Sequence, residues 1–164
     1  MSAAPAPQSP GDHAVWALLG AVPDPEIPVV SIVDLGIVRY VRRGEDGRLH
    51  VGLTPTYSGC PATEVIRATV RAALDAGGHA DAVLEQVLTP PWSSDWIGAE
   101  GRRKLAHFGI APPSPEREAR GATIPCPRCG GSHTQRLGEF GSTPCKAHWR
   151  CRDCGEPFDY FKCL

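Results

Sequence analysis

Hydrophobic and polar positions in the first part of the chain follow first the period of a helix and then that of a strand. A short helix is predicted over 13–20, whereas three prolines exclude a regular helix from the loop 22–30. The later part of 31–41 is β-branched and apolar, and 49–53 alternates as a second strand. Because the turn-forming sequence Glu45-Asp46-Gly47-Arg48 lies between them, a β-hairpin is predicted.

A longer amphipathic helix is predicted after the hairpin. Ile66, Val70 and Leu74 recur every four residues, and the paired glycines at 77–78 predict the end of the helix. Pro61 suits the first turn, because a residue at that position needs no backbone N–H.

Two further elements complete this part of the chain. Residues 82–88 are predicted as a third strand or, alternatively, as a short helix. Another helix is expected over about 94–108, with Leu105 and Phe108 facing inward. The order α-β-β-α-β-α indicates an α+β domain over 12–110, in which helices pack on a small sheet.

The remaining segments differ from this domain in composition. Residues 1–11 are rich in Ala, Pro and Ser, which predicts a disordered tail. Residues 111–123 combine prolines and charges without an apolar face, which predicts a linker. The last segment, 124–164, contains six of the seven cysteines and is predicted to form a second, smaller domain.

Composition and charge exclude several functional classes. The formal net charge is −1, so the chain has no overall attraction to nucleic acid, and no nucleic-acid partner is expected. No stretch approaches the roughly 20 apolar residues that span a bilayer, and the first residues do not resemble a signal peptide. A cytoplasmic location is therefore expected, where clustered cysteines are more often metal ligands or reactive groups than disulfides.

Two cysteine pairs with the same spacing, Cys126–Cys129 and Cys151–Cys154, form the most specific motif of the chain. Two residues between the cysteines let both sulfurs of a tight turn face one ion, and two such turns complete a tetrahedron. A glycine follows each pair and permits a left-handed backbone, which leaves N–H groups available to bond thiolate sulfur. The motif therefore predicts a metal site with these four cysteines as ligands.

Three strands are predicted around this motif, near 134–140, 146–150 and 156–162. So short a domain cannot build a sufficient core unaided, and metal binding is expected to supply much of its folding free energy. The pattern is that of a β zinc ribbon with one structural zinc ion. Iron or an iron–sulfur cluster is the alternative, because four-cysteine spacing does not select the metal.

Two cysteines of the tail, Cys145 and Cys163, lie outside the paired motif. One interpretation places them in the small core as buried hydrophobes. The other makes them a redox couple or ligands of an additional metal. His133 and His148 are alternative ligands by position, although four available cysteines make them surface groups instead.

Cys60 lies where the long helix is predicted to begin, in the sequence Thr-Pro-Thr-Tyr-Ser-Gly-Cys-Pro. A thiol there is close to the positive end of the helix dipole, which favours thiolate, the form that binds metal or attacks electrophiles. The alternative is a buried cysteine without a chemical role. No histidine is placed by sequence to act as its base, so a protease-like pair is unsupported.

Two carboxylates, Glu26 and Asp34, lie on or beside the proline-rich loop. Such groups can bind metal or act in acid–base chemistry, but they more often cap turns and helices. Asp34 stands out, because a carboxylate within an apolar run needs a partner.

The segments DPEIPVVSIVDLGIVR and TPTYSGCPA and the cysteine-rich tail with FGSTPCK and FDYFKC resemble the PaaD family. The resemblance runs from about 13 to 164, and the N-terminal part is also similar to the iron–sulfur assembly domain of SufT-type proteins. It implies a non-catalytic accessory or maturation protein for the oxygenase that epoxidises phenylacetyl-CoA in aerobic phenylacetate degradation. A structural docking subunit or a thiol redox protein is the alternative.

The resemblance also implies roles for particular residues. Cys60 matches the expected reactive or metal-transfer thiol, with Asp34 and Glu26 in the matching loop. The tail cysteines, including Cys145 and Cys163, fall on the family's cysteine-rich ribbon. The implied partners are the di-iron oxygenase and iron–sulfur reductase subunits of the epoxidase, or the iron–sulfur assembly machinery. His148-Trp149 departs from the Leu-Tyr-like pair expected there, which casts no doubt on the metal ligands.

Overall fold

The computed structural model describes residues 10–164, with side chains from residue 13 onward. These residues divide into two compact units, with the boundary between Gly98 and Ala99. The predicted tail, 1–11, lies outside the described residues except for its last two residues, which belong to helix α1 (Pro10–Gly20). Within the described residues, no helix has both the length and the apolar character that a bilayer-spanning segment requires.

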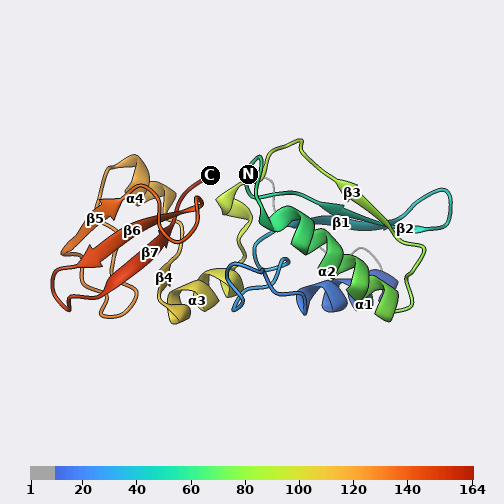
Figure 1. Cartoon of the computed structure of the whole chain (residues 1–164), viewed down its shortest axis with the longest axis horizontal. Helices are drawn as coiled ribbons and strands as arrows, with labels where there is room; N and C mark the ends of the chain where they lie inside the picture. The colour runs from blue at the N-terminus through green and yellow to red at the C-terminus, as the bar shows by residue number, and fades with distance from the viewer. Residues whose placement is uncertain (1–9) are drawn as a thin grey trace. The chain divides into compact units, whose positions relative to one another are not determined.

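The first unit is built on a three-stranded sheet with the order β1-β2-β3. Strands β1 (Val38–Arg43) and β2 (Leu49–Leu53) pair antiparallel, so the predicted hairpin is confirmed. Helix α2 (Ala62–Ala76) then carries the chain to β3 (Val83–Gln86), which pairs parallel to β2. Figure 1 shows α1 and α2 next to each other beside this sheet.

The core of this unit forms where the helices meet the sheet. Ile66, Val70 and Leu74 of α2 are buried, as their four-residue repeat predicts. They share the core with buried side chains of α1 and of the sheet, among them Leu19 and Val51. The fold class is therefore α+β, with helices on a small sheet.

Three loops of the first unit meet at one end of the sheet. The loop before β1 and the loop after β2 share this end because the two strands are antiparallel, and the loop after β3 joins them because β3 is parallel to β2. Trp92 Nε1 donates to the carbonyl oxygen of Leu35 at 2.9 Å. Gly36 has φ +68°, and a Cβ atom there would lie 2.7 Å from Cβ of Trp96. These contacts fix the loops around the end of the sheet that also carries Cys60.

The helix predicted over 94–108 is interrupted. A short 3₁₀ helix, η1 (Ser94–Trp96), is separated from α3 (Ala99–Phe108) by Ile97, whose backbone is extended. Leu105 is buried as predicted, but the inward orientation predicted for Phe108 is wrong, because its side chain is 56% exposed. Phe108 is the last residue of the helix, and Gly109 follows it with a φ of 96°, so the helical period no longer sets the direction of its side chain.

The second unit contains a four-stranded sheet with the order β4-β7-β6-β5. The predicted ribbon strands are present as β5 (Thr134–Gly138), β6 (Lys146–Cys151) and β7 (Pro157–Phe161), and all neighbours among them are antiparallel. Strand β4 (Ile110–Ala111) pairs parallel to β7 and contacts α3. These contacts group 99–110 with the ribbon, whereas the sequence pattern assigns these residues to the first domain.

The segment predicted as a linker, 111–123, contains helix α4 (Pro115–Ala119). The backbone N–H of Ser114 donates to Tyr160 Oη at 3.1 Å, and that hydroxyl donates to Glu118 Oε2 at 2.8 Å. Polar contacts therefore attach the segment to β7. Such contacts leave no hydrophobic period in the sequence, so the linker prediction could not include them.

Candidate functional site

The second unit brings four cysteine sulfurs together. Cys126 and Cys129 lie in the turn before β5, whereas Cys151 ends β6 and Cys154 lies in the turn before β7. All four sulfurs lie within 4.8 Å of one another. The Cys126–Cys154 pair of Sγ atoms is 3.8 Å apart and the Cys129–Cys151 pair 3.6 Å.

These separations fit one tetrahedral metal ion. A zinc–sulfur bond of about 2.3 Å places the corners of a regular tetrahedron about 3.8 Å apart. A multi-iron cluster would hold its cysteine sulfurs farther apart, because more than one iron atom lies between them. The donor set and its dimensions therefore suit a single ion that prefers four thiolates.

The two cysteine turns share one backbone geometry. The N–H of Cys126 donates to the carbonyl oxygen of Gly131 at 2.9 Å, and the N–H of Cys151 donates to that of Glu156 at 2.8 Å. Gly130 and Gly155, which follow the two pairs, have φ values of 75° and 79°. The left-handed backbone predicted at these glycines is confirmed, and its physical reason is the missing Cβ atom.

Backbone N–H donors lower the pKa values of Cys129 and Cys151, whereas neighbouring sulfurs raise the pKa of Cys129 and lower that of Cys151. The N–H of Cys154 is the main cause that lowers the pKa of Cys151 to about 7. The N–H of Gly131 donates to Cys129 Sγ at 3.4 Å and favours its thiolate, but the neighbouring sulfurs outweigh it and raise the pKa of Cys129 to about 12. All four groups can lose their protons together only when a cation neutralises the charge. The four thiols therefore suit a bound metal cation.

The two histidines of the ribbon lie outside this sulfur cluster. His133 Nδ1 is 3.3 Å from Asp153 Oδ1, and His148 Nδ1 is 3.3 Å from Asp159 Oδ1. Among the described residues, the group of potential metal ligands consists of the four cysteines and includes no histidine.

Cys145 and Cys163 also lie outside the cluster of four. Cys145 is buried, with its Sγ 3.0 Å from Thr143 Oγ1. Cys163 is half-buried, with its Sγ 3.6 Å from Tyr160 Oη and its N–H donating to Glu118 Oε2 at 3.1 Å. Neither of them forms a disulfide in the structure.

Cys60 lies in the first unit, in the loop between β2 and α2. It is half-buried, its N–H donates to the carbonyl oxygen of Tyr57 at 3.2 Å, and its carbonyl oxygen accepts from Thr63 at 3.1 Å. It lines a pocket of ≈ 350 Å³ whose other residues include Ser58, Glu64 and Leu88. The thiol therefore has open space beside it.

The loop carboxylates take part in shaping the backbone. Asp34 Oδ2 accepts the N–H of Ser31 at 2.8 Å, while Ser31 Oγ accepts the N–H of Asp34 at 3.0 Å. Asp24 Oδ1 accepts the N–H groups of Glu26 and Ile27 at 2.9 and 2.8 Å. Asp34 thus has the partner that its apolar surroundings require, and Glu26 is half-buried in the same loop.

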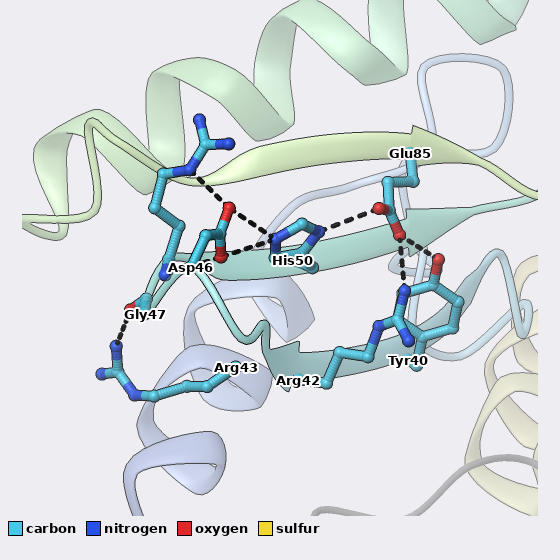
Figure 2. A network of polar contacts seen from close by, with 8 residues as sticks. Tyr40, Arg42, Arg43, Asp46, Gly47, His50 and Glu85 are labelled. Carbon is cyan, nitrogen blue, oxygen red and sulfur yellow. Dashed lines mark hydrogen bonds and ion pairs between the residues drawn. The ribbon is translucent and has the colours of Figure 1, made fainter.

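A polar network on the three-stranded sheet does not follow from the sequence pattern (Figure 2). His50 of β2 lies between two carboxylates: its Nδ1 is 2.8 Å from Glu85 Oε1, and its Nε2 is 3.2 Å from Asp46 Oδ1. Tyr40 and Arg42 of β1 donate to Glu85 Oε2. The alternation of β1 and β2 places these side chains on one face, but only the pairing with β3 brings Glu85 to them.

This network shifts the pKa values of its members. Hydrogen bonds from Tyr40 first, and from His50 next, lower the pKa of Glu85 to about 2. Arg48 is the main cause that lowers the pKa of Asp46 to about 2. Glu85 and then Asp46 raise the pKa of His50 above its usual value.

Two known families match the chain, one in its N-terminal part and the other in its C-terminal part. Residues 12–90 match the family described as iron-sulfur cluster assembly protein, and residues 110–162 match the PaaD zinc beta ribbon domain. A crystal structure of a DUF59 domain of unknown function from Bacillus anthracis superposes with a TM-score of 0.52 at 30% identity. That match covers 57% of this chain and 89% of the other.

Two named relatives extend this result. The "Fe-S protein maturation auxiliary factor YitW" of Bacillus subtilis is 39% identical over 82 residues, covering 49% of this chain and 79% of the relative. A protein of Escherichia coli K12, named as one subunit of a "Putative 1,2-phenylacetyl-CoA epoxidase", is 46% identical over 159 residues, covering 94% of each chain. With this identity over nearly the whole length of both proteins, the chain belongs to the PaaD family.

Proposed function

We propose that this protein is an accessory factor that helps to assemble the iron or iron–sulfur centres of phenylacetyl-CoA epoxidase. The names of the relatives support both halves of this proposal, since one is an epoxidase subunit and another a maturation factor. The seven cysteines, all within the described residues, form no disulfide, and such cysteines are typical of a reducing compartment, which supports a cytoplasmic place of action.

We assign the ribbon site to one structural zinc ion. Zinc accepts four thiolates in tetrahedral geometry and has no redox chemistry, so Cys126, Cys129, Cys151 and Cys154 would hold the second unit together. A site whose four positions are all taken by protein ligands offers no open position to a substrate. The ribbon then stabilises the protein or contacts partners.

The observation that carries the proposal is the pocket beside Cys60. Cys60 lies outside the four-cysteine cluster and lines ≈ 350 Å³ of open space. Thiolate sulfur binds iron, so Cys60 is the group we assign to contact the iron or cluster during transfer. Asp34 is a loop-shaping residue in this proposal, because it accepts a backbone N–H.

Exposed apolar side chains lie near this pocket. Leu88, one of its lining residues, is 61% exposed, and Val65 in the first turn of α2 is 52% exposed. Exposed apolar side chains that lie together mark contact surfaces. We therefore place the contact with an oxygenase or reductase subunit, or with the assembly machinery, at this end of the first unit.

Substitution of Cys60 tests the transfer role. The Cys60→Ser variant, co-expressed with the epoxidase subunits, should fold normally but leave the purified epoxidase with as little iron and sulfide as a parallel co-expression that omits this protein. Ser58→Ala, in the same loop and pocket, is the matched control and should restore full metal content. Full iron and sulfide content with Cys60→Ser would contradict the proposal.

A stable docking subunit is the second candidate, favoured by the word subunit in the name of the Escherichia coli relative. It predicts that this protein co-purifies with the active oxygenase at a fixed ratio and that Cys60→Ser leaves the metal content unchanged. Free exchange of this protein during purification would count against it.

A further inference from the structure

A pocket of ≈ 430 Å³ lies in the second unit beside the metal site. Its walls come from α3, from the segment that contains α4, and from the first cysteine turn, and Cys126 is one of the lining residues. The volume falls within the range of about 300–1,000 Å³ that is usual for small-molecule sites. All of the lining residues belong to this one unit.

The floor of this pocket is apolar and rigid. Four prolines line it together with Ile124 and Ala106; the prolines are Pro112, Pro113, Pro125 and Pro127. Proline has a fixed φ and no backbone N–H, so such walls keep their shape and offer few donors. This surface suits an aromatic ring or a short aliphatic chain.

All charged side chains that line the pocket are positive. Arg102 and Arg117 line it, and none of the described lining residues is acidic. Arg102 Nη1 donates to the carbonyl oxygen of Pro113 at 2.7 Å, which holds this side chain against the wall. Arg117 is exposed, and its Nη1 donates to the carbonyl oxygen of Thr123 at 3.3 Å. A carbonyl acceptor orients a guanidinium without neutralising it, so Arg117 brings a positive charge to the pocket.

A second pocket of the same unit differs in the charges of its lining residues. Its volume is ≈ 230 Å³, and its cations Arg136 and Lys162 both pair with Glu139, which lines it as well. Its charges are therefore balanced by its own lining. The larger pocket differs because its lining contains arginines and no carboxylate side chain.

We propose that the pocket between α3, α4 and the first cysteine turn binds a small amphipathic anion, with an apolar ring or chain on the proline wall and a carboxylate or phosphate at Arg117, beside Arg102. Arginine binds both kinds of group through paired N–H donors. This inference does not depend on the transfer role of Cys60, because the two sites lie in different units.

Phenylacetate and phenyl phosphate are suitable probes, since each combines one ring with one anionic group. Titrated into the metal-loaded full-length protein, they should cause saturable NMR shifts at the amides of Ala106 and Ile124. Phenylacetamide, which has the same shape as phenylacetate but no charge, should bind roughly tenfold more weakly or worse, because a charged hydrogen bond contributes about 1.5–3 kcal/mol. The anion that binds more tightly identifies the preferred class.

Substitution of Arg117 tests the assignment of the anionic end. Because Arg117 is exposed, Arg117→Met should fold, and it should weaken phenylacetate binding roughly tenfold or more. Arg120→Met removes an equal charge three residues away, outside the lining, and should leave the affinity unchanged. Absence of saturable shifts with both anions, equal binding of phenylacetamide, or equal effects of the two substitutions would overturn the proposal.

Discussion

At the scale of single residues, the four ribbon sulfurs show how closely a metal site depends on charge. Neighbouring thiols raise the pKa of Cys129 to about 12, while backbone N–H groups lower that of Cys151 to about 7. A bound cation offsets the repulsion among four negatively charged sulfurs, so that all four cysteines can be thiolates at once. The same argument predicts that removing any one ligand weakens the site greatly.

A pair of serine substitutions tests this dependence. Cys126→Ser should abolish stoichiometric metal binding, because a neutral hydroxyl replaces a thiolate in the tetrahedron. Cys145→Ser is the matched control: it lies in the same unit, outside the cluster, and should keep one ion per chain. Elemental analysis with a visible spectrum measures both results.

The same measurement decides the metal of the ribbon. Zinc without a visible band agrees with a structural site, whereas iron with charge-transfer bands would contradict the zinc assignment. Equal metal content in the two variants would contradict the assignment of Cys126 as a ligand.

At the scale of elements, the network around His50 connects the three strands of the first sheet. Tyr40 and Arg42 come from β1, His50 from β2 and Glu85 from β3, while Asp46 lies in the turn of the hairpin. Protonated His50 attracts both carboxylates that flank it. The stability of the sheet should therefore depend on pH.

The sign of this dependence follows from the pKa shifts. Folding raises the pKa of His50, so its contribution is complete below about pH 6.5 and is lost as the pH rises through the folded value. Folding lowers the pKa values of Asp46 and Glu85 to about 2, so their contribution is present above about pH 4.5 and is lost on acidification.

Chemical denaturation of wild-type protein and His50→Gln at pH 5.5 and pH 8.5 measures this effect. The wild type should lose more stability than the variant between the two pH values, since glutamine cannot carry the charge. An equal loss in both proteins would show that His50 does not stabilise the sheet through its charge.

Elements whose apolar period is long and regular follow from the sequence. The repeat of Ile66, Val70 and Leu74 predicts α2, and the turn at 45–48 predicts the hairpin. Helix α4 and the break at Ile97 do not follow from it. Distant contacts accompany both: Tyr160 bonds to Ser114 and Glu118 at α4, and the N–H of Gly98, next to the break, donates to the carbonyl oxygen of Asp34 at 3.0 Å. No local period records such contacts.

At the scale of the whole molecule, the two units of the chain are stabilised in different ways. The first has a continuous apolar core under its sheet, whereas the second has a smaller apolar cluster that includes two of the cysteine ligands, Cys126 and Cys151. Structural zinc contributes about 10–16 kcal/mol to folding in small zinc domains. The second unit should therefore depend on metal far more than the first.

Removal of the metal with a strong chelator tests this difference. Hydrogen exchange should show that amides of β5, β6 and β7 lose protection, while those of β1, β2 and α2 keep it. Restoring zinc should restore protection in the ribbon strands. Retained protection of the ribbon strands after chelation, or equal loss in both units, would contradict a metal-dependent second unit.

The sequence by itself determined the α+β character of the first unit, the ribbon strands and the pairing of two cysteine turns. These features depend on local spacing, on apolar periods and on the backbone freedom of glycine. Only the tertiary structure decided that 99–110 group with the ribbon through β4, that α4 is fixed to β7, and that His50 lies between Asp46 and Glu85. Such features arise from contacts between segments far apart in the chain, which local patterns cannot specify.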